Sequence, residues 1–268
     1  MKKANWLICN PLPNTLTSCN KDLNGGYGTW DKIGNSLISK FIAKSKKNNI
    51  KIPVLCLGYI TAILEEKGKN CLYSENIIDS KIQIQQKVIE GVVIYGSIVC
   101  CDLENKLISQ IRELDKNIKI FVVGTYPTKF PDNFKDADYI VVGEPEEFFI
   151  NWSGNLKDLV DKNKHIFSEN LKNLDYLPIP IFTKTYSKKF SYSPMLSRPT
   201  GFIEATRGCP YSCGYYCTYG ENQGKTIRSH SPKRLVKIMK ELISNYGFRS
   251  FQFRDPVFGL KKGFIDEF

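Results

Sequence analysis

Several features that would place a chain in a familiar class are missing from this sequence of 268 residues. No apolar run approaches the roughly 20 residues that cross a bilayer, so we expect a soluble protein with no membrane partner. The apolar stretch at the N-terminus meets Asn10, Pro11 and Pro13 before it reaches the length of a signal-peptide core, about 7 to 15 residues, which predicts a cytoplasmic location. The sequence also has no P-loop, no Ser-His-Asp set and no convincing carboxylate pair.

The composition fits one large or two ordinary globular domains. Hydrophobic residues make up 42% of the chain and aromatic residues 12%, which is enough to bury a core, and the formal net charge is +11. The lysines are scattered through amphipathic segments, and the compact cluster at residues 44–51 has no interleaved aromatics. We therefore expect a solvated helix end and no nucleic-acid partner, with attraction to an anionic substrate or cofactor as the alternative reason for the charge.

Residues 4–160 alternate short strands with amphipathic helices, which is the pattern of a parallel sheet covered on both faces. The strands are rich in Val, Ile and aromatic residues, as strands buried on both faces should be. The sequence predicts a doubly wound, Rossmann-like α/β domain over residues 1–155. Strands are expected at residues 5–10, 71–76, 91–97, 118–124 and 139–144, and helices at residues 53–68 and 104–117.

Small residues follow the last three of these strands. In open α/β sheets ligands bind outside the carboxyl ends of the strands, and glycine there lets the backbone approach a ligand closely. The alternative is that each glycine only turns the chain after a strand. The predicted cofactor-binding residues at this edge are Gly96, Ser97, Gly124, Thr125, Tyr126, Gly143 and Glu144.

A second unit is predicted at residues 198–268, after a polar and proline-containing linker at residues 156–197. Its helix has Ser231 as the expected N-cap and Gly247 as the expected stop. The order of strand, long loop, helix and strand indicates a parallel βαβ unit. We expect the strands at residues 201–208 and 248–255 and the helix at residues 231–247.

The strongest chemical signal is a loop that holds Cys209, Cys213 and Cys217 within nine residues. An odd number of thiols in a cytosolic protein argues against a disulfide, and a closed zinc site needs a fourth ligand that the neighbouring sequence lacks. Three thiolates suit an iron-sulfur cluster with one iron open to a substrate or cofactor. Zinc and structural thiols are the alternatives. For the other six cysteines we expect buried packing.

Polar residues near this loop have two interpretations each. Glu204 and Arg207 could serve the metal site or form an ion pair at the strand end. Arg254 and Asp255 end the second strand, where functional groups collect, but structural pairing explains them equally well. Arg228 and His230 could contact an acidic group, but we favour the alternative that they cap the helix that begins after Ser231.

Residues 201–247 resemble the opening of a radical S-adenosylmethionine (radical SAM) domain, and the preceding domain resembles the cobalamin-binding domain that is fused to such enzymes. Residues 122–132 and 139–149 match the Gly-rich loop and the Gly-Glu segment of that domain. The resemblance implies cobalamin at the sheet edge and SAM bound to the open iron of a 4Fe-4S cluster. The implied cluster ligands are Cys209, Cys213 and Cys217, and Tyr216 is expected beside the SAM adenine.

Two segments differ from the commonest pattern of the family. Three residues separate Cys213 from Cys217, where two are commonest, and the longer spacing is a variant of the motif. The Asp-x-His-x-x-Gly signature that ligates cobalt from below is absent, since residues 98–105 read IVCCDLEN. The resemblance therefore implies cobalamin without a histidine lower ligand.

A strand-helix unit of a barrel takes roughly 30 residues, so residues 198–268 have room for about two units. We expect the start of a partial radical SAM barrel, from a truncated frame or a split protein whose second chain completes it. The first hypothesis for function is a methyltransferase that acts on an unactivated carbon through a 5′-deoxyadenosyl radical. Its partners would be a small-molecule or peptide substrate and an electron donor, and no side chain is assigned as catalytic.

Other functions fit parts of the same pattern. A radical SAM cyclase would use the same scaffold for ring formation. A non-catalytic module would retain cobalamin or a nucleotide while the incomplete barrel does nothing. A zinc or nucleic-acid protein is the third hypothesis, and metal analysis and salt-dependent duplex binding would identify it.

Overall fold

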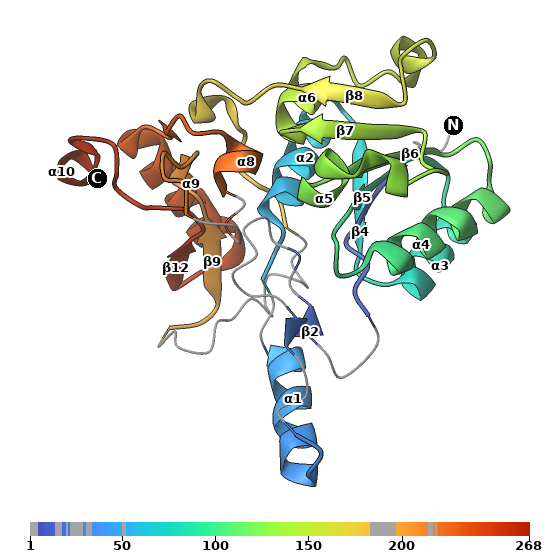
Figure 1. Ribbon diagram of the computed structural model, residues 1–268, viewed down its shortest axis with the longest axis horizontal. Coiled ribbons are helices and arrows are strands. Elements are labelled where there is room, and N and C mark those ends of the chain that lie inside the picture. The colour runs from blue at the N-terminus through green and yellow to red at the C-terminus, as the bar shows by residue number, and fades with distance from the viewer. Residues whose placement is uncertain are drawn as a thin grey trace.

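The computed structural model describes residues 5–13, 18–19, 21, 29–30, 34–49, 52–182, 197–213, 217 and 219–268. Its centre is a six-stranded sheet in the order β4-β1-β5-β6-β7-β8, and every neighbouring pair of strands is parallel. Helices lie on both faces of this sheet (Figure 1), so the predicted Rossmann-like α/β fold is confirmed. The strands are β1 (Asn5–Cys9), β4 (Asn70–Ser74), β5 (Ile89–Tyr95), β6 (Lys119–Val123), β7 (Tyr139–Gly143) and β8 (His165–Ser168).

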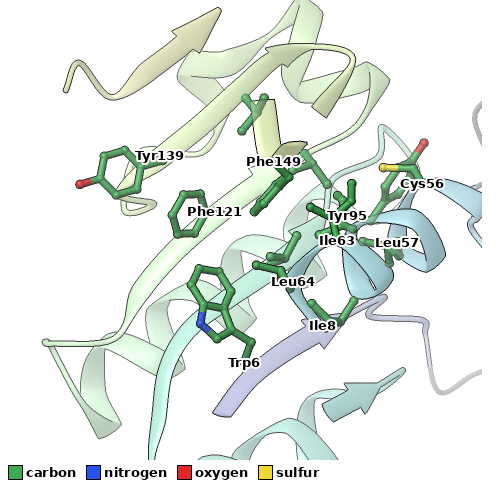
Figure 2. Close-up of a cluster of buried hydrophobic side chains, with 14 of the residues drawn as sticks. Trp6, Ile8, Cys56, Leu57, Ile63, Leu64, Tyr95, Phe121, Tyr139 and Phe149 are labelled. Carbon is green, nitrogen blue, oxygen red and sulfur yellow. The ribbon is translucent and has the colours of Figure 1, made fainter. Parts of the chain in front are cut away.

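The sheet separates two hydrophobic cores, because successive side chains of a strand point to opposite faces. Trp6 of β1 lies in one core and Leu7 lies in the other. Aromatic rings fill the first core, as Figure 2 shows, and the rings of Trp6 and Phe121 lie 5.5 Å apart between centroids. The covering helices are α2 (Leu55–Glu66) and α6 (Pro145–Asn151) over the first core, and α3 (Ile77–Gln86) and α4 (Cys101–Leu114) over the second.

Several elements of the sheet unit differ from the sequence prediction, and helices α3 and α6 were not predicted at all. The helix predicted from residue 104 begins at Cys101, because the Glu104 N–H already donates to the carbonyl of Cys100 at 2.9 Å. Strand β8 lies inside residues 156–197, which the sequence pattern assigns to a linker. This strand is short and has no fully buried residue, so it lacks the apolar run by which the other strands are recognised.

The remaining elements before the second unit are short or isolated. Strands β2 and β3 form an antiparallel pair of two residues each. Helix α1 extends away from the sheet in Figure 1. These elements are β2 (Ser18–Cys19), β3 (Thr29–Trp30), α1 (Leu37–Asn49), α5 (Thr125–Lys129) and the 3-10 helices η1 (Pro131–Asn133), η2 (Leu156–Leu159) and η3 (Leu174–Tyr176).

The second unit contains the predicted βαβ arrangement. Its two strands are parallel, and the helix between them begins where Ser231 accepts a hydrogen bond from the Arg234 N–H at 3.2 Å. The helix ends at Gly247, whose φ of 68° is the left-handed conformation expected of a C-terminal glycine. The elements are β9 (Thr200–Ile203), α9 (Pro232–Tyr246), β12 (Ser250–Phe253), and the short helices α8 (Tyr219–Gln223) and α10 (Phe264–Glu267).

The strand predicted at residues 201–208 is interrupted after β9. It continues as β10 (Thr206–Arg207), which pairs antiparallel with β11 (Arg228–Ser229). At the break, the Asp255 carboxylate accepts hydrogen bonds from the backbone N–H groups of Ala205 and Thr206. A side chain from the end of β12 thus takes the place of a strand partner, and it turns the chain toward the cysteine loop.

The two units share a third hydrophobic core. Tyr59 of α2, Phe202 of β9 and Leu235 of α9 all lie in it, and each is at most 1% exposed. Because α2 also covers the sheet, this one helix contributes to the cores of both units. Within the described part of the chain, no helix combines the length and the apolar character that a membrane crossing requires.

Candidate cofactor site at the sheet edge and the cysteine loop

The three glycines at the carboxyl edge of the sheet are in close contact with other parts of the protein. Gly143 has a φ of 112°, and a Cβ atom there would lie 2.0 Å from the carbonyl oxygen of Ser168. Gly124 has a φ of 123°, and its Cβ atom would lie 2.8 Å from the carbonyl oxygen of Gly96. At Gly96 the Cβ atom would meet Pro127 at 2.9 Å. Packing between neighbouring loops therefore accounts for these glycines, and their contact with a ligand stays a prediction.

Four of the predicted edge residues line one cleft together with residues of the second unit. Gly124, Thr125, Gly143 and Glu144 line one side of it. Residues around the cysteine loop complete the lining, among them Arg207, Asn222 and Gln223. The sheet edge and the base of the cysteine loop therefore face each other across the same cleft, which is narrow, with a volume of about 20 Å³.

Ser97 belongs to a separate buried group that sequence reasoning did not find. Its N–H and its hydroxyl each donate to the Glu104 carboxylate at 2.9 Å. Lys21 forms an ion pair with the same carboxylate at 2.8 Å, and neither charged side chain is exposed. Burial raises the pKa of Glu104, and Lys21 and Ser97 act in the opposite direction. No sequence pattern links residues this far apart.

Tyr126 faces a second hollow of about 580 Å³. The Asn133 amide donates to its hydroxyl at 2.6 Å, and the loop after β5 supplies the apolar residues Ile98 and Val99 to the lining. Ile98 is 73% exposed, although it is large and apolar. Asp102 and Asn133 also line this open hollow at the carboxyl end of the sheet, so its lining is polar as well as apolar.

The three cysteines of the loop are free thiols in different surroundings. Cys209 is buried, Cys217 is half-buried and Cys213 is exposed. The Cys209 N–H donates to the carbonyl of Gly224 at 3.0 Å, which closes the base of the loop. Gly208 precedes it with a φ of 89°, and a Cβ atom there would lie 2.1 Å from the carbonyl oxygen of Thr226. Only glycine fits at this position.

Thiolates are the donors that iron-sulfur clusters and zinc select, so the chemistry of the loop fits either metal centre. Among the residues described here, no three His, Cys, Asp or Glu side chains are grouped closely enough to hold a metal ion. Residues 214–216 and 218 are outside the described residues, and Tyr216 is among them. The metal assignment of Cys209, Cys213 and Cys217 and the role of Tyr216 therefore stay predictions.

Arg207 lies two residues before Cys209 and forms a buried ion-pair network. Its guanidinium contacts Glu204 at 2.6 Å, Glu146 at 2.9 Å and Glu144 at 3.4 Å. It also lies over the ring of Tyr59, 5.8 Å from the centroid. The ion pair of Arg207 with Glu204 matches one of the two interpretations of these residues, but the sequence did not indicate the carboxylates of the first unit.

Arg228 was expected to cap α9, but it binds Glu144. Two nitrogens of its guanidinium donate to the two oxygens of this carboxylate at 2.6 and 2.9 Å. Burial opposes ionisation of Glu144, but Arg207 and Arg228 outweigh it and lower the pKa of the carboxyl group. For Glu146, burial raises the pKa and Arg207 only partly compensates. Of the two interpretations of Arg228, contact with an acidic group is confirmed and the favoured capping role is wrong, because the partner comes from a strand end 84 residues away.

His230 is fully buried and also does not cap the helix through its side chain. Its Nδ1 atom lies 3.3 Å from a carboxylate oxygen of Asp175, and that oxygen also accepts a hydrogen bond from the Ser231 N–H. Burial lowers the pKa of His230 to about 4, against the opposing effect of Asp175. The other histidine, His165, begins β8. Neither ring lines the cleft or the hollow described above.

Asp255 and the remaining cysteines have structural surroundings. Desolvation raises the pKa of Asp255 to about 6 even though it accepts several hydrogen bonds. The prediction of buried packing holds for three cysteines, whereas two are half-buried, and the side chain of Cys19 lies outside the described part. The buried cysteines are Cys9, Cys56 and Cys100, and the half-buried ones are Cys71 and Cys101.

Comparison with known proteins gives one informative similarity. No family model matches the chain. A protein of Pyrococcus horikoshii that is named as an uncharacterized methyltransferase is 25% identical to this chain over 173 residues. The similarity covers 56% of this chain and 36% of that protein, so the chain matches only about a third of the length of this relative.

Proposed function

We propose that this chain is the cofactor-binding part of a radical SAM methyltransferase that uses cobalamin. The sheet edge would hold cobalamin, and the cysteine loop would hold a 4Fe-4S cluster to which SAM binds. The name of the Pyrococcus horikoshii relative supports methyl transfer as the broad class of reaction. The radical SAM and cobalamin parts of the proposal depend on the sequence motifs and on the geometry of the site.

The observation that carries the proposal is the shared cleft. Gly124, which follows β6, and Gly143, the last residue of β7, lie opposite Arg207 and Gln223 at the base of the cysteine loop. An enzyme that passes a group between two cofactors must hold them at neighbouring sites, because reacting atoms need to approach to about 3 to 3.5 Å. The arrangement of the two loops supports such neighbouring sites.

Each part of the chain has a defined task in this proposal. The thiolates of Cys209, Cys213 and Cys217 would ligate the cluster, and the hollow beside Tyr126, which polar and apolar residues line together, would take part of the corrin ring. When bound, the cluster supplies the electron for reductive cleavage of SAM, and cobalamin supplies the methyl group. The protein binds and orients the two cofactors and excludes water from the cleft between them.

Metal analysis after anaerobic reconstitution with iron, sulfide and cobalamin tests the proposal. We expect about four irons and four sulfides per chain, as a 4Fe-4S cluster requires, together with bound cobalt. Replacing Cys209, Cys213 or Cys217 by alanine should each abolish iron binding. Cys71→Ala is the matched control, because this half-buried cysteine lies on β4, outside the loop.

The outcomes separate the alternatives. Cobalamin retention without iron would favour a non-catalytic binding module. Zinc in place of iron would contradict the cluster. With iron and cobalamin both present, incubation with SAM and a strong reductant should release 5′-deoxyadenosine. Formation of S-adenosylhomocysteine in the same reaction would support methyl transfer over ring formation, and absence of both products would refute the enzymatic reading.

A further inference from the structure

The base of the cysteine loop is tied to the first unit through Arg207. Its three carboxylate partners come from two places in the chain, since Glu204 follows β9 and both Glu144 and Glu146 stand at the start of α6. Arg207 is 2% exposed and the side chains of its partners are at most 6% exposed. A buried charge pair that loses one member leaves the other unpaired in a medium of low dielectric constant, which is strongly unfavourable.

The network is also continuous with the backbone of the loop. Arg207 of β10 pairs in register with Arg228 of β11, and both guanidinium groups contact Glu144. The Gly208 N–H donates to the side chain of Gln223 at 3.1 Å, and the carbonyl of Gln223 accepts from Arg228 at 2.6 Å. Both ends of the loop that contains Cys209 are therefore attached to one carboxylate at the sheet edge.

We infer that Arg207 is a positioning residue that fixes the cysteine loop relative to the carboxyl edge of the six-stranded sheet. Arginine suits this task because its planar guanidinium presents several donors in a fixed geometry, whereas lysine presents a single point charge. Through Glu144 and Glu146, a displacement of α6 would move the peptide that carries Cys209. The chemical consequence rests on the proposed function, because the position of the loop would set the position of the cluster relative to cobalamin. The attachment of the loop to the sheet edge exists without either cofactor.

Alkylation of Cys209 in the reduced, metal-free protein tests this attachment across the two units. Cys209 is 5% exposed, so it reacts only when the base of the loop opens. Glu146→Ala removes a partner of Arg207 on α6 and should increase the alkylation rate of Cys209 by roughly tenfold or more. Cys213 of the same loop is exposed and serves as the internal reference. Peptide mass spectrometry assigns each modified cysteine.

Glu147→Ala is the matched control, because Glu147 is adjacent on α6 and contacts Ser168 and Asn151 instead of Arg207. It should leave the alkylation rate of Cys209 unchanged within about twofold. Arg207→Lys retains the charge but loses the planar guanidinium with its several donors. It should increase the alkylation rate of Cys209 as Glu146→Ala does. Equal alkylation rates of Cys209 in the wild type, Glu146→Ala and Arg207→Lys would overturn the inference. So would an increase of this rate in Glu147→Ala as large as that in Glu146→Ala.

A second readout links the attachment to the metal centre. In protein reconstituted with iron and sulfide, Arg207→Lys should shift the reduction potential of the cluster, while Arg112→Lys should not. Arg112 forms a half-buried ion pair with Asp138, which immediately precedes the start of β7, far from the carboxyl edge. If the wild type binds no iron, the proposed function fails, and the alkylation experiment still decides whether Arg207 positions the loop. An unchanged potential in Arg207→Lys would contradict the link to the metal centre.

Discussion

Replacing Gly143 by alanine should destabilise the protein far more than the same change at Gly68. Both glycines have positive φ angles, 112° and 77°, so alanine is strained at either position. A Cβ atom at Gly68 meets nothing within 4 Å, whereas at Gly143 it would lie 2.0 Å from the backbone oxygen of Ser168. Gly68 thus reports the cost of backbone strain alone, and Gly143 adds the cost of separating β7 from β8.

The expected magnitudes follow from these contacts. Left-handed strain should cost Gly68→Ala about 1.5 kcal/mol. Gly143→Ala should cost about 4 kcal/mol, from strain of about 2 kcal/mol and overpacking of about 2 kcal/mol. With an m-value of roughly 3 kcal/mol/M, the urea midpoint should fall by about 0.5 M for Gly68→Ala and about 1.3 M for Gly143→Ala.

Circular dichroism during urea titration measures both midpoints. The proposed function adds the expectation that Gly143→Ala lowers cobalamin retention, because Glu144 follows directly and lines the cleft. Equal shifts of the two midpoints would show that the backbone of β8 does not approach Gly143 as closely as described, and the steric account of this strand end would then be refuted.

Three further outcomes are expected. Burial lowers the pKa of His230 to about 4 from its ordinary value of 6.5, so folding favours the neutral ring. His230 therefore contributes stability that is complete above pH 6.5 and is lost as the pH falls toward 4. The loss in the free energy of unfolding should approach about 3 kcal/mol. Over this range the urea midpoint of His230→Asn should depend less on pH than that of the wild type, and identical pH profiles of the two proteins would contradict this. Ser231→Ala should lower the free energy of urea unfolding by about 1 kcal/mol, since the hydroxyl caps α9. A decrease below about 0.3 kcal/mol would argue against the cap. In the metal-free protein Cys213 should be alkylated well before Cys9, whose burial raises the pKa to about 12; the reverse order would be inconsistent with the fold.

Local patterns in the sequence predicted five of the six strands of the central sheet and the βαβ arrangement of the second unit. The Val- and Ile-rich runs of β5, β6 and β7 are recognisable because each strand is buried on both faces. The ends of α9 were predicted from Ser231 and Gly247, whose roles depend only on the adjacent backbone. Strand β8 was missed because an edge strand with half-exposed residues has no such pattern.

The candidate site was predicted less completely, because its contacts join distant segments. The glycines after the strands and the three cysteines were visible in the sequence, but the cleft that brings Gly143 and Arg207 together was not. For Arg228, capping of the neighbouring helix was favoured over contact with an acidic group, since the helix end is the nearest partner that sequence order suggests. In the structure its partner is Glu144.

The sequence by itself determined the α/β class, the order of the elements and the spacing of the three thiols, because these depend on hydrophobic periodicity and on residues next to each other in the chain. The tertiary structure alone decided which charges meet. Arg207 and Arg228 reach Glu144 because the parallel sheet brings the end of β7 beside β10 and β11, and their ion pairs form where water is excluded. Long-range pairing of buried charges follows from topology and burial, and neither can be read from local sequence.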